Sequence, residues 1–206
     1  MDGGARIVTA ASPTPRLLDT NASGPGANIW WGIVGLIAVE ITVFAALIAS
    51  YYYYQVLSPG WPPESPPPLL LPTVNTFVLI GSSIAIAIAD RGIRDGRQGR
   101  LRAGLVASIL FAIAFLVLKG MELADKDYHW DTHAYGSIVW MMLGLHSLHV
   151  LSVLLKSLVM AVLAFRGYFS ERRYVGVQVN GMYWHFVVVI WIPIYITLYL
   201  SPRMGG

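Results

Sequence analysis

The chain has 206 residues, of which 56% are hydrophobic and only 12% are charged, and its formal net charge is +3. Soluble domains carry about a quarter of charged residues, so this composition excludes an ordinary water-facing surface and indicates an integral membrane protein. The absence of cysteine excludes disulfides, thiolate metal sites, iron–sulfur clusters and cysteine nucleophiles.

The chain divides into a tail and a membrane domain. Residues 1–28 are rich in Gly, Ala, Ser, Thr and Pro and have no apolar core behind a basic start. They are predicted to form a flexible N-terminal tail rather than a signal peptide. Residues 29–206 are predicted to form one transmembrane domain, because no segment between its apolar stretches is long enough to fold alone.

Five apolar stretches follow the tail, and each is long enough to cross the roughly 30 Å of hydrocarbon in a bilayer. The expected fold class is therefore all-α, a polytopic membrane bundle of five transmembrane helices. Tyrosines fill every position from Tyr51 to Tyr54 and suit the aromatic belt at a bilayer edge. The last helix is expected to stop at Ser201 and Pro202. We place the five helices at residues 29–54, 71–89, 103–123, 133–162 and 181–200.

Arginines are unevenly distributed among the connections. The connection at 90–102 carries five arginines, and the connection after the fourth span carries three more. The proline-rich connection at 58–72 has none, and the connection at 124–132 is acidic. The positive-inside rule then predicts a cytoplasmic N-terminus and a C-terminus outside. Because topology explains the arginines, no nucleic-acid partner is expected.

Glu40 is the clearest ionisable residue within a predicted span, about ten residues and about 15 Å from its start. At that depth a carboxyl group needs a partner, a water-filled cleft or a proton. It could serve as a proton-relay carboxylate or as a polar anchor that holds helices or lipid. The plainer interpretation is a neutral acid that is hydrogen-bonded to a neighbouring helix. The residues alone leave these alternatives open.

Three histidines fall within the predicted spans. His146 and His149 lie three residues apart on one face of the fourth span, and His185 lies near the start of the fifth. Haem or copper ligation would need ligands from two helices at matched depth, and these depths match poorly. Hydrogen-bonded packing histidines are therefore the favoured interpretation.

Two lysines lie near span ends. Lys119 and Glu122 are three residues apart, so they can form an ion pair near the end of the third span, and Lys119 is expected to extend toward the surface. Lys156 can extend likewise from the fourth span and could meet a lipid phosphate. Signatures of serine hydrolases, zinc proteases and phosphate-binding glycine loops are absent from the sequence.

Several motifs occur in a characteristic order and spacing. Residues 183–187 read Tyr-Trp-His-Phe-Val, and Trp191 follows them. The fourth span reads Tyr-Gly-Ser at 135–137 and Gly-x-His-x-x-His-Val at 144–150. Trp-Pro-Pro at 61–63 precedes these motifs. From about residue 32 to residue 200 the chain resembles subunit III of the haem–copper cytochrome oxidases, in the five-helix bacterial form that lacks two N-terminal helices.

The resemblance implies a non-catalytic subunit of a terminal respiratory oxidase in the bacterial cytoplasmic membrane. Such a subunit binds no haem or copper, which belong to its partners. It packs against catalytic subunit I in a complex with subunit II, and a small subunit IV or a larger supercomplex are further possible partners. It holds structural phospholipids in a cleft between its first two helices and the rest, and it sustains proton uptake.

The same resemblance assigns roles to particular residues. Glu40 occupies the position of the family's intramembrane glutamate near the cleft, and Glu122 occupies the position of a second one. Trp61 and His185 are implied lipid contacts. The full set of lipid-cleft or intramembrane polar candidates is Glu40, Trp61, Glu122, His146, His149 and His185.

Two departures distinguish this chain from the family pattern: Val188 replaces an aspartate, and Lys119 replaces a glutamine. Both alter polar contacts and leave the topology unchanged. Two other functions stay open from the sequence. One is a subunit III-like protein of nitric oxide reduction, and the other is an independent membrane transporter or cytochrome. The residues do not decide between quinol and cytochrome c as electron donor.

Overall fold

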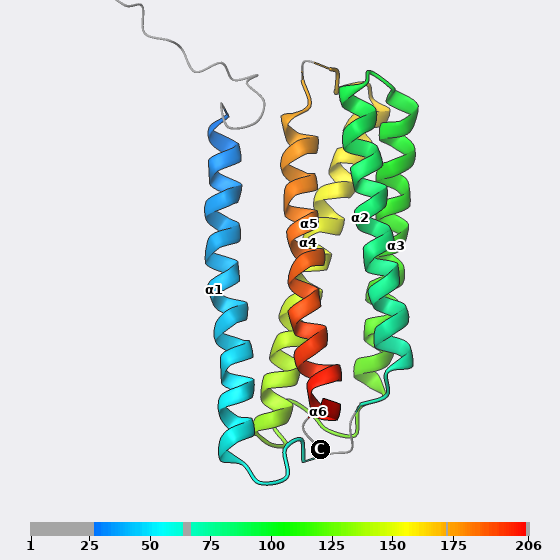
Figure 1. Ribbon diagram of the computed structural model, residues 1–206. Coiled ribbons are helices and arrows are strands. Elements are labelled where there is room, and N and C mark those ends of the chain that lie inside the picture. Colours follow the sequence, from blue (N-terminus) through cyan, green and yellow to red (C-terminus); the bar gives the residue numbers. More distant parts are fainter. Residues whose placement is uncertain (1–26, 64–66, 172, 205–206) are drawn as a thin grey trace, which may run out of the picture.

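The computed structural model describes residues 27–63, 67–171 and 173–204, so nearly all of the predicted tail lies outside the described residues. Five helices are long and apolar enough to cross a membrane, which confirms the expected all-α bundle (Figure 1). The fifth continues through a π-helical turn, η2 (Ile196–Leu200), into α6 (Ser201–Met204). The long helices are α1 (Asn28–Leu57), α2 (Leu70–Arg94), α3 (Gln98–Ala124), α4 (Ala134–Phe165) and α5 (Val175–Tyr195).

The helices extend beyond the apolar stretches that predicted them. α2 runs five residues past its predicted end, and the ion pair between Arg94 and Asp90, at 2.6 Å, supports this extra turn. α5 begins at Val175, six residues before its predicted start. Its polar residue Asn180 has a partner within the bundle, because Nδ2 donates to Ser157 Oγ on α4 at 2.8 Å. The apolar stretches therefore predicted the membrane-embedded part of these helices but not where the helices begin and end.

The predicted stop at Pro202 is wrong, because the chain stays helical to Met204. Pro202 occupies the first turn of α6, where the missing backbone N–H is tolerated. Pro193 lies inside α5, where it removes one donor from the helical ladder. The π-helical turn η2 follows three residues later, so the hydrogen-bonding pattern changes within this helix.

Seen from the side, α1 lies on one flank of the bundle and the antiparallel pair α2 and α3 on the other (Figure 1). α4 and α5 lie between them. α1 packs mainly against α4 and α5, whereas α2 packs most extensively against α3. The first two helices therefore do not form a unit. Among the described helices, no cleft separates this pair from the other three.

Close approach of α2 and α3 depends on small residues. Gly104 of α3 lies so near α2 that an added Cβ would stand 2.6 Å from Ala89 N and 2.7 Å from Ala85 O. Small residues at such contacts let membrane helices pack closely. The short turn between the two helices contains Gly96 at φ +70°, a conformation that favours glycine.

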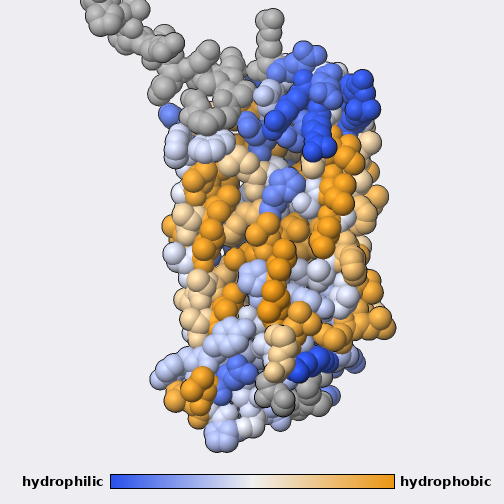
Figure 2. Space-filling view, viewed as in Figure 1, coloured by the Kyte–Doolittle hydropathy of each residue, from blue (hydrophilic) through white to orange (hydrophobic). Residues whose placement is uncertain are grey.

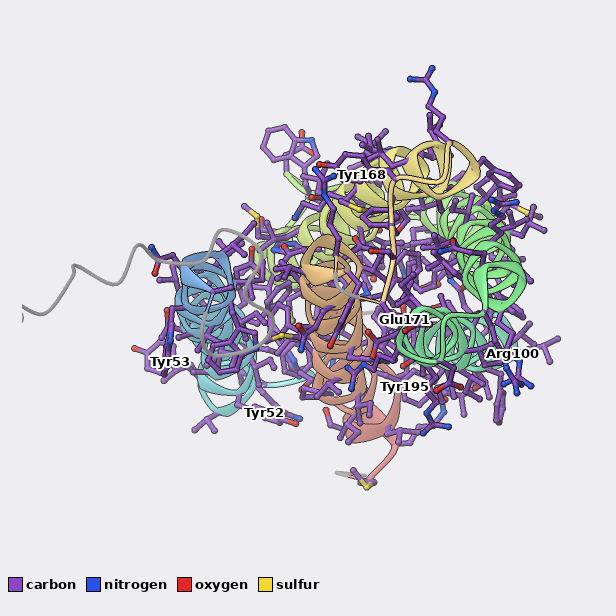
Figure 3. The ribbon with its side chains drawn as sticks, turned by 90° about the horizontal axis from the view of Figure 1, so that it is seen from above. Tyr52, Tyr53, Arg100, Tyr168, Glu171 and Tyr195 are labelled. Atoms are coloured by element: carbon purple, nitrogen blue, oxygen red, sulfur yellow. The ribbon has the colours of Figure 1, made fainter. Side chains whose placement is uncertain are left out.

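The surface has a broad apolar band between two polar ends (Figure 2). One end, called the arginine-rich end below, carries exposed Arg91, Arg94, Arg97 and Arg100. Tyr52 and Tyr53 of α1 point away from the bundle (Figure 3), as an aromatic belt requires. Tyr51 is instead fully buried in the core.

Candidate functional site

The predicted intramembrane glutamate has partners from two other helices. Tyr183 of α5 donates its hydroxyl hydrogen to Glu40 Oε1 at 2.8 Å. His149 of α4 places Nε2 3.4 Å from the same oxygen. The Glu40 side chain is only 16% exposed, and its Oε2 is buried without a hydrogen-bond partner among the described residues. Glu40 therefore fastens α1 to α4 and α5.

Geometry at His149 fixes the orientation of its ring. Its Nδ1 is 2.6 Å from the backbone oxygen of Leu145, which can only accept, so Nδ1 carries a hydrogen. Nε2 is thereby directed at Glu40, and His149 holds its ring between its own helix and α1.

A groove of about 380 Å³ lies beside this pair, between α1, α4 and α5. It covers the half of the bundle nearer the arginine-rich end, since it begins at Ile29 and Gly176 and reaches Tyr183. Its walls are apolar apart from Lys156, Asn180 and Tyr183. An apolar groove with a few polar groups can hold an amphipathic molecule.

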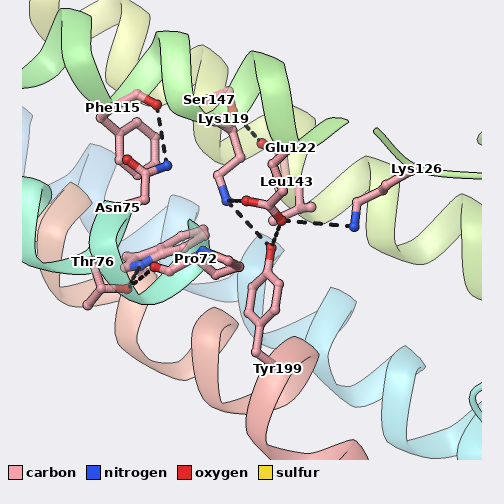
Figure 4. Close-up of polar contacts among 11 residues, drawn as sticks. Pro72, Asn75, Thr76, Phe115, Lys119, Glu122, Lys126, Leu143, Ser147 and Tyr199 are labelled. Carbon is pink, nitrogen blue, oxygen red and sulfur yellow. Dashed lines mark hydrogen bonds and ion pairs between the residues drawn. The ribbon is translucent and has the colours of Figure 1, made fainter. Parts of the chain in front are cut away.

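The predicted ion pair between Lys119 and Glu122 is confirmed, with Nζ 2.6 Å from Oε2 (Figure 4). Its predicted extension to the surface is wrong, because the Lys119 side chain is 1% exposed. Tyr199 of η2 donates to Glu122, and Lys126 places its Nζ 3.9 Å from that carboxylate. Trp191 offers its ring face to Lys119 at 4.3 Å. Two lysines and two aromatic rings thus enclose one carboxylate.

Lys126 lies beyond the end of α3, at the edge of this ion-pair cluster. Burial lowers the pKa of Lys126, and the nearby Glu122 and Asp125 carboxylates counteract that effect. The cluster therefore holds more positive than negative charge when all three of its ionisable side chains are ionised. It is a structural junction between α3 and the end of the fifth helix.

The remaining predicted site histidines lie apart from each other. His146 is fully buried and packs against Trp191 with ring centroids 4.9 Å apart and the rings tilted by 32°. It has no hydrogen-bond partner among the described residues, so the prediction of a hydrogen-bonded histidine does not hold there. His185 places Nδ1 2.7 Å from Ser83 Oγ on α2. Within the described ranges no three His, Asp or Glu side chains gather as a metal site.

Trp61 belongs to an aromatic cluster at the end opposite the arginines. Its ring stacks on Tyr54 with an interplanar angle of 13° and meets Tyr135 edge-on at 5.1 Å. Tyr51 packs against it at 5.4 Å. This cluster joins the loop after α1 to the start of α4.

The structure brings together only Glu40 and His149 of the six predicted site residues. Sequence reasoning missed Tyr183, the hydrogen-bond donor to Glu40, although it lies in the quoted Tyr-Trp-His-Phe-Val motif. It also missed Tyr199 and Lys126 around Glu122. Spacing within one helix revealed Lys119 and Glu122, whereas contacts between helices distant in sequence left no local signal.

The chain is similar to known proteins over most of its length. The family model for cytochrome c oxidase subunit III matches residues 19–202. Cytochrome c oxidase subunit 3 of Synechocystis sp. is 33% identical over 82% of this chain and 74% of its own length. The same-named proteins of Drosophila yakuba and Mus musculus are each 28% identical over 82% of this chain and 68% of theirs. With its five membrane-spanning helices, the chain is a multi-pass membrane protein that belongs to the cytochrome c oxidase subunit III family.

Proposed function

We propose that this chain is the non-catalytic subunit III of a respiratory haem–copper oxidase that reduces O2. The observation that carries the proposal is the family match across residues 19–202. The polar interior agrees with a supporting role, because Glu40 and Glu122 are both engaged by side chains of this chain. On this proposal the haem and copper lie in subunits I and II, and this chain stabilises subunit I.

A second part of the proposal concerns lipid and protons. The groove between α1, α4 and α5 is apolar and opens near one end of the bundle, which suits a structural phospholipid. By holding lipid against the complex, the chain would sustain proton uptake by subunit I over many turnovers. On this view Glu40 and His149 hold α1 beside the groove and do not feed protons to the oxygen-reducing centre.

Co-purification tests the proposed function. The chain, tagged and expressed in its own membrane, should bring down subunits I and II together with haem and copper, and the complex should consume O2. Recovery with a nitric oxide reductase instead would establish the competing assignment. Recovery of the chain alone from mild detergent, with no haem-containing partner, would refute both.

We also propose that the arginine-rich end faces the cytoplasm, in a bacterial inner membrane, with the N-terminus on the same side. Because the chain has no cysteine, single cysteines report cleanly on topology. Arg97→Cys should react with an impermeant thiol reagent only in inside-out vesicles, and Asp127→Cys only in intact spheroplasts. Labelling of both from outside would overturn this orientation.

Glu40→Gln is expected to leave assembly, initial turnover and proton pumping near normal. Glutamine keeps the size of the side chain, and its carbonyl oxygen can still accept from Tyr183, so the junction with α5 survives without a titratable proton. Durability should suffer, measured as the number of turnovers before half the activity is lost. Immediate loss of pumping in an assembled complex would show instead that Glu40 relays protons.

A further inference from the structure

The acidic connection between α3 and α4 forms a small aromatic pocket at the end of the bundle opposite the arginines. The cavity measures about 300 Å³, and two tryptophans line it, Trp130 of the connection and Trp140 of α4. Ser137 and Met141 of α4 complete the lining. Ligand pockets measure about 300–1,000 Å³, so a pocket at the lower limit suits a single long side chain better than a larger molecule.

Hydrogen bonds to the first turns of α4 hold the pocket in shape. Trp140 Nε1 donates to the backbone oxygen of Tyr128 at 2.9 Å. Ser137 Oγ donates to the backbone oxygen of Trp130 at 2.6 Å. Although its backbone is fixed in this way, Trp130 is 66% exposed. A large aromatic ring is therefore held at the surface, where a partner can reach it without any rearrangement of the connection.

The surface around the pocket is negatively charged. Asp125, Asp127 and Asp131 are all exposed, and within the described ranges no ion pair engages Asp127 or Asp131. The connection's one lysine or arginine, Lys126, is directed into the bundle. Its side chain is 8% exposed, and its ammonium lies 3.9 Å from Glu122. The three surface carboxylates are therefore not neutralised by the only cationic side chain of their own connection.

Membrane topology does not account for these carboxylates. The positive-inside rule depends on Lys and Arg and is little affected by Asp and Glu, so the arginines at the other end already satisfy it. An aromatic belt would explain exposed rings, but Trp130 and Trp140 converge on one cavity from two segments. Among aromatic side chains, tryptophan attracts cations most strongly. Two indole rings beside negative charge therefore form a site for a cation.

Charge and orientation decide which cation can enter. Anionic lipid headgroups are repelled by the three carboxylates. A second copy of this chain in the same membrane has the same orientation, so its arginine-rich end lies on the other side. The N-terminal tail also joins α1 at that other end (Figure 1). Arg203, which lies at the pocket's end of the bundle, is bonded to the backbone oxygens of Tyr199 and Pro67. The cation must therefore come from a different protein.

We infer that the pocket docks a basic segment of another protein on the same side of the membrane. An arginine or lysine side chain of that segment enters between Trp130 and Trp140, and Asp127 and Asp131 attract the segment around it. Tryptophan and arginine are the side chains that most often dominate protein interfaces, and complementary charge speeds association. This surface is separate from the groove beside α1, and the inference does not depend on the oxidase assignment.

A pair of peptides tests the docking chemistry on the intact complex purified from its own membrane. The probe is a fluorescent peptide of sequence Gly-Arg-Gly-Arg-Gly. Its matched control carries citrulline, a neutral analogue of arginine with nearly the same shape. Fluorescence anisotropy at low ionic strength should show about fivefold tighter binding of the arginine peptide, and added salt should reduce the difference. Equal affinity for the two peptides would overturn the inference.

Two variants and two matched controls locate the bound peptide. Trp130→Ala removes the exposed ring, and Asp131→Asn removes a charge beside it. Each should weaken binding of the arginine peptide about fivefold. Trp31→Ala and Asp95→Asn make the same changes at the arginine-rich end, where the two side chains are 59% and 56% exposed, and they should leave binding unchanged. Undiminished binding in both pocket variants would contradict the assignment.

Cross-linking in native membranes then identifies the neighbour of the pocket. A photoreactive benzoyl-phenylalanine in place of Trp130 should form adducts with a segment of another protein that contains arginine or lysine. Adducts with lipid alone, or only with segments that lack basic residues, would refute a basic protein partner. Because the peptide measurements read the pocket directly, they stand whether or not haem-containing subunits co-purify with the chain.

Discussion

Glu122→Gln is expected to lower the free energy of unfolding of the bundle by about 3–5 kcal/mol, because it leaves buried positive charge without a counter-charge. Lys119 and Lys126 both direct their ammonium groups at this carboxylate, and their side chains are 1% and 8% exposed. The glutamine keeps the shape of Glu122 and removes only the charge. Unfolding of the purified chain in mixed micelles, titrated with a denaturing detergent, measures the loss.

Two control variants separate charge from shape. Adding Lys119→Gln to Glu122→Gln removes the buried ion pair altogether and should restore most of the lost stability, since replacing both partners is far less costly than breaking a pair. Lys126→Gln alone removes a more distant charge, whose ammonium lies 3.9 Å from Glu122, and leaves the Lys119–Glu122 pair intact, so it should cost less stability than Glu122→Gln. No recovery in the double variant would contradict the assigned electrostatics.

Gly104→Ala is expected to destabilise the chain by about 1–3 kcal/mol, the usual cost of overpacking a well-packed contact. The added methyl group would collide with the backbone of α2 at Ala85 and Ala89, which cannot rotate away. α2 and α3 must therefore separate along their closest contact. The same detergent titration should show the loss.

Gly120→Ala is the matched control on the same helix. An added Cβ at Gly120 meets nothing within 4 Å, and alanine is favoured over glycine in a helix interior by about 1 kcal/mol. The two substitutions should thus act with opposite signs, and equal effects would show that the α2–α3 contact does not govern stability.

Sequence alone predicted the parts of this fold that depend on local composition. The five spans follow from apolarity, and the Lys119–Glu122 pair follows from a spacing of three residues on one helix. Helix ends were less predictable: residues 175–180, which include the polar Gln178 and Asn180, were assigned to a connection but lie inside α5. The burial of Lys119 was missed because it depends on Trp191 and Tyr199, which arrive from another helix.

The site was predictable as a list of unusual residues and not as an arrangement. Glu40 and His149 were each identified, but nothing in their spacing indicates that they meet. Tyr183, which donates to Glu40, is 143 residues from it in sequence. The groove left still less signal, because its lining residues come together only when three helices pack side by side.

The placement of α1 on the flank has a consequence for biogenesis. α1 is synthesised first among the described helices, yet it docks mainly on α4 and α5, which are synthesised last. The α2–α3 hairpin has a short turn and extensive mutual contacts, so it can assemble as soon as it leaves the ribosome. α1 must wait in the lipid until α4 brings His149 to Glu40 and the final helix brings Tyr183. The Glu40 junction therefore closes in two steps, and a product truncated before α5 lacks the hydrogen bond from Tyr183.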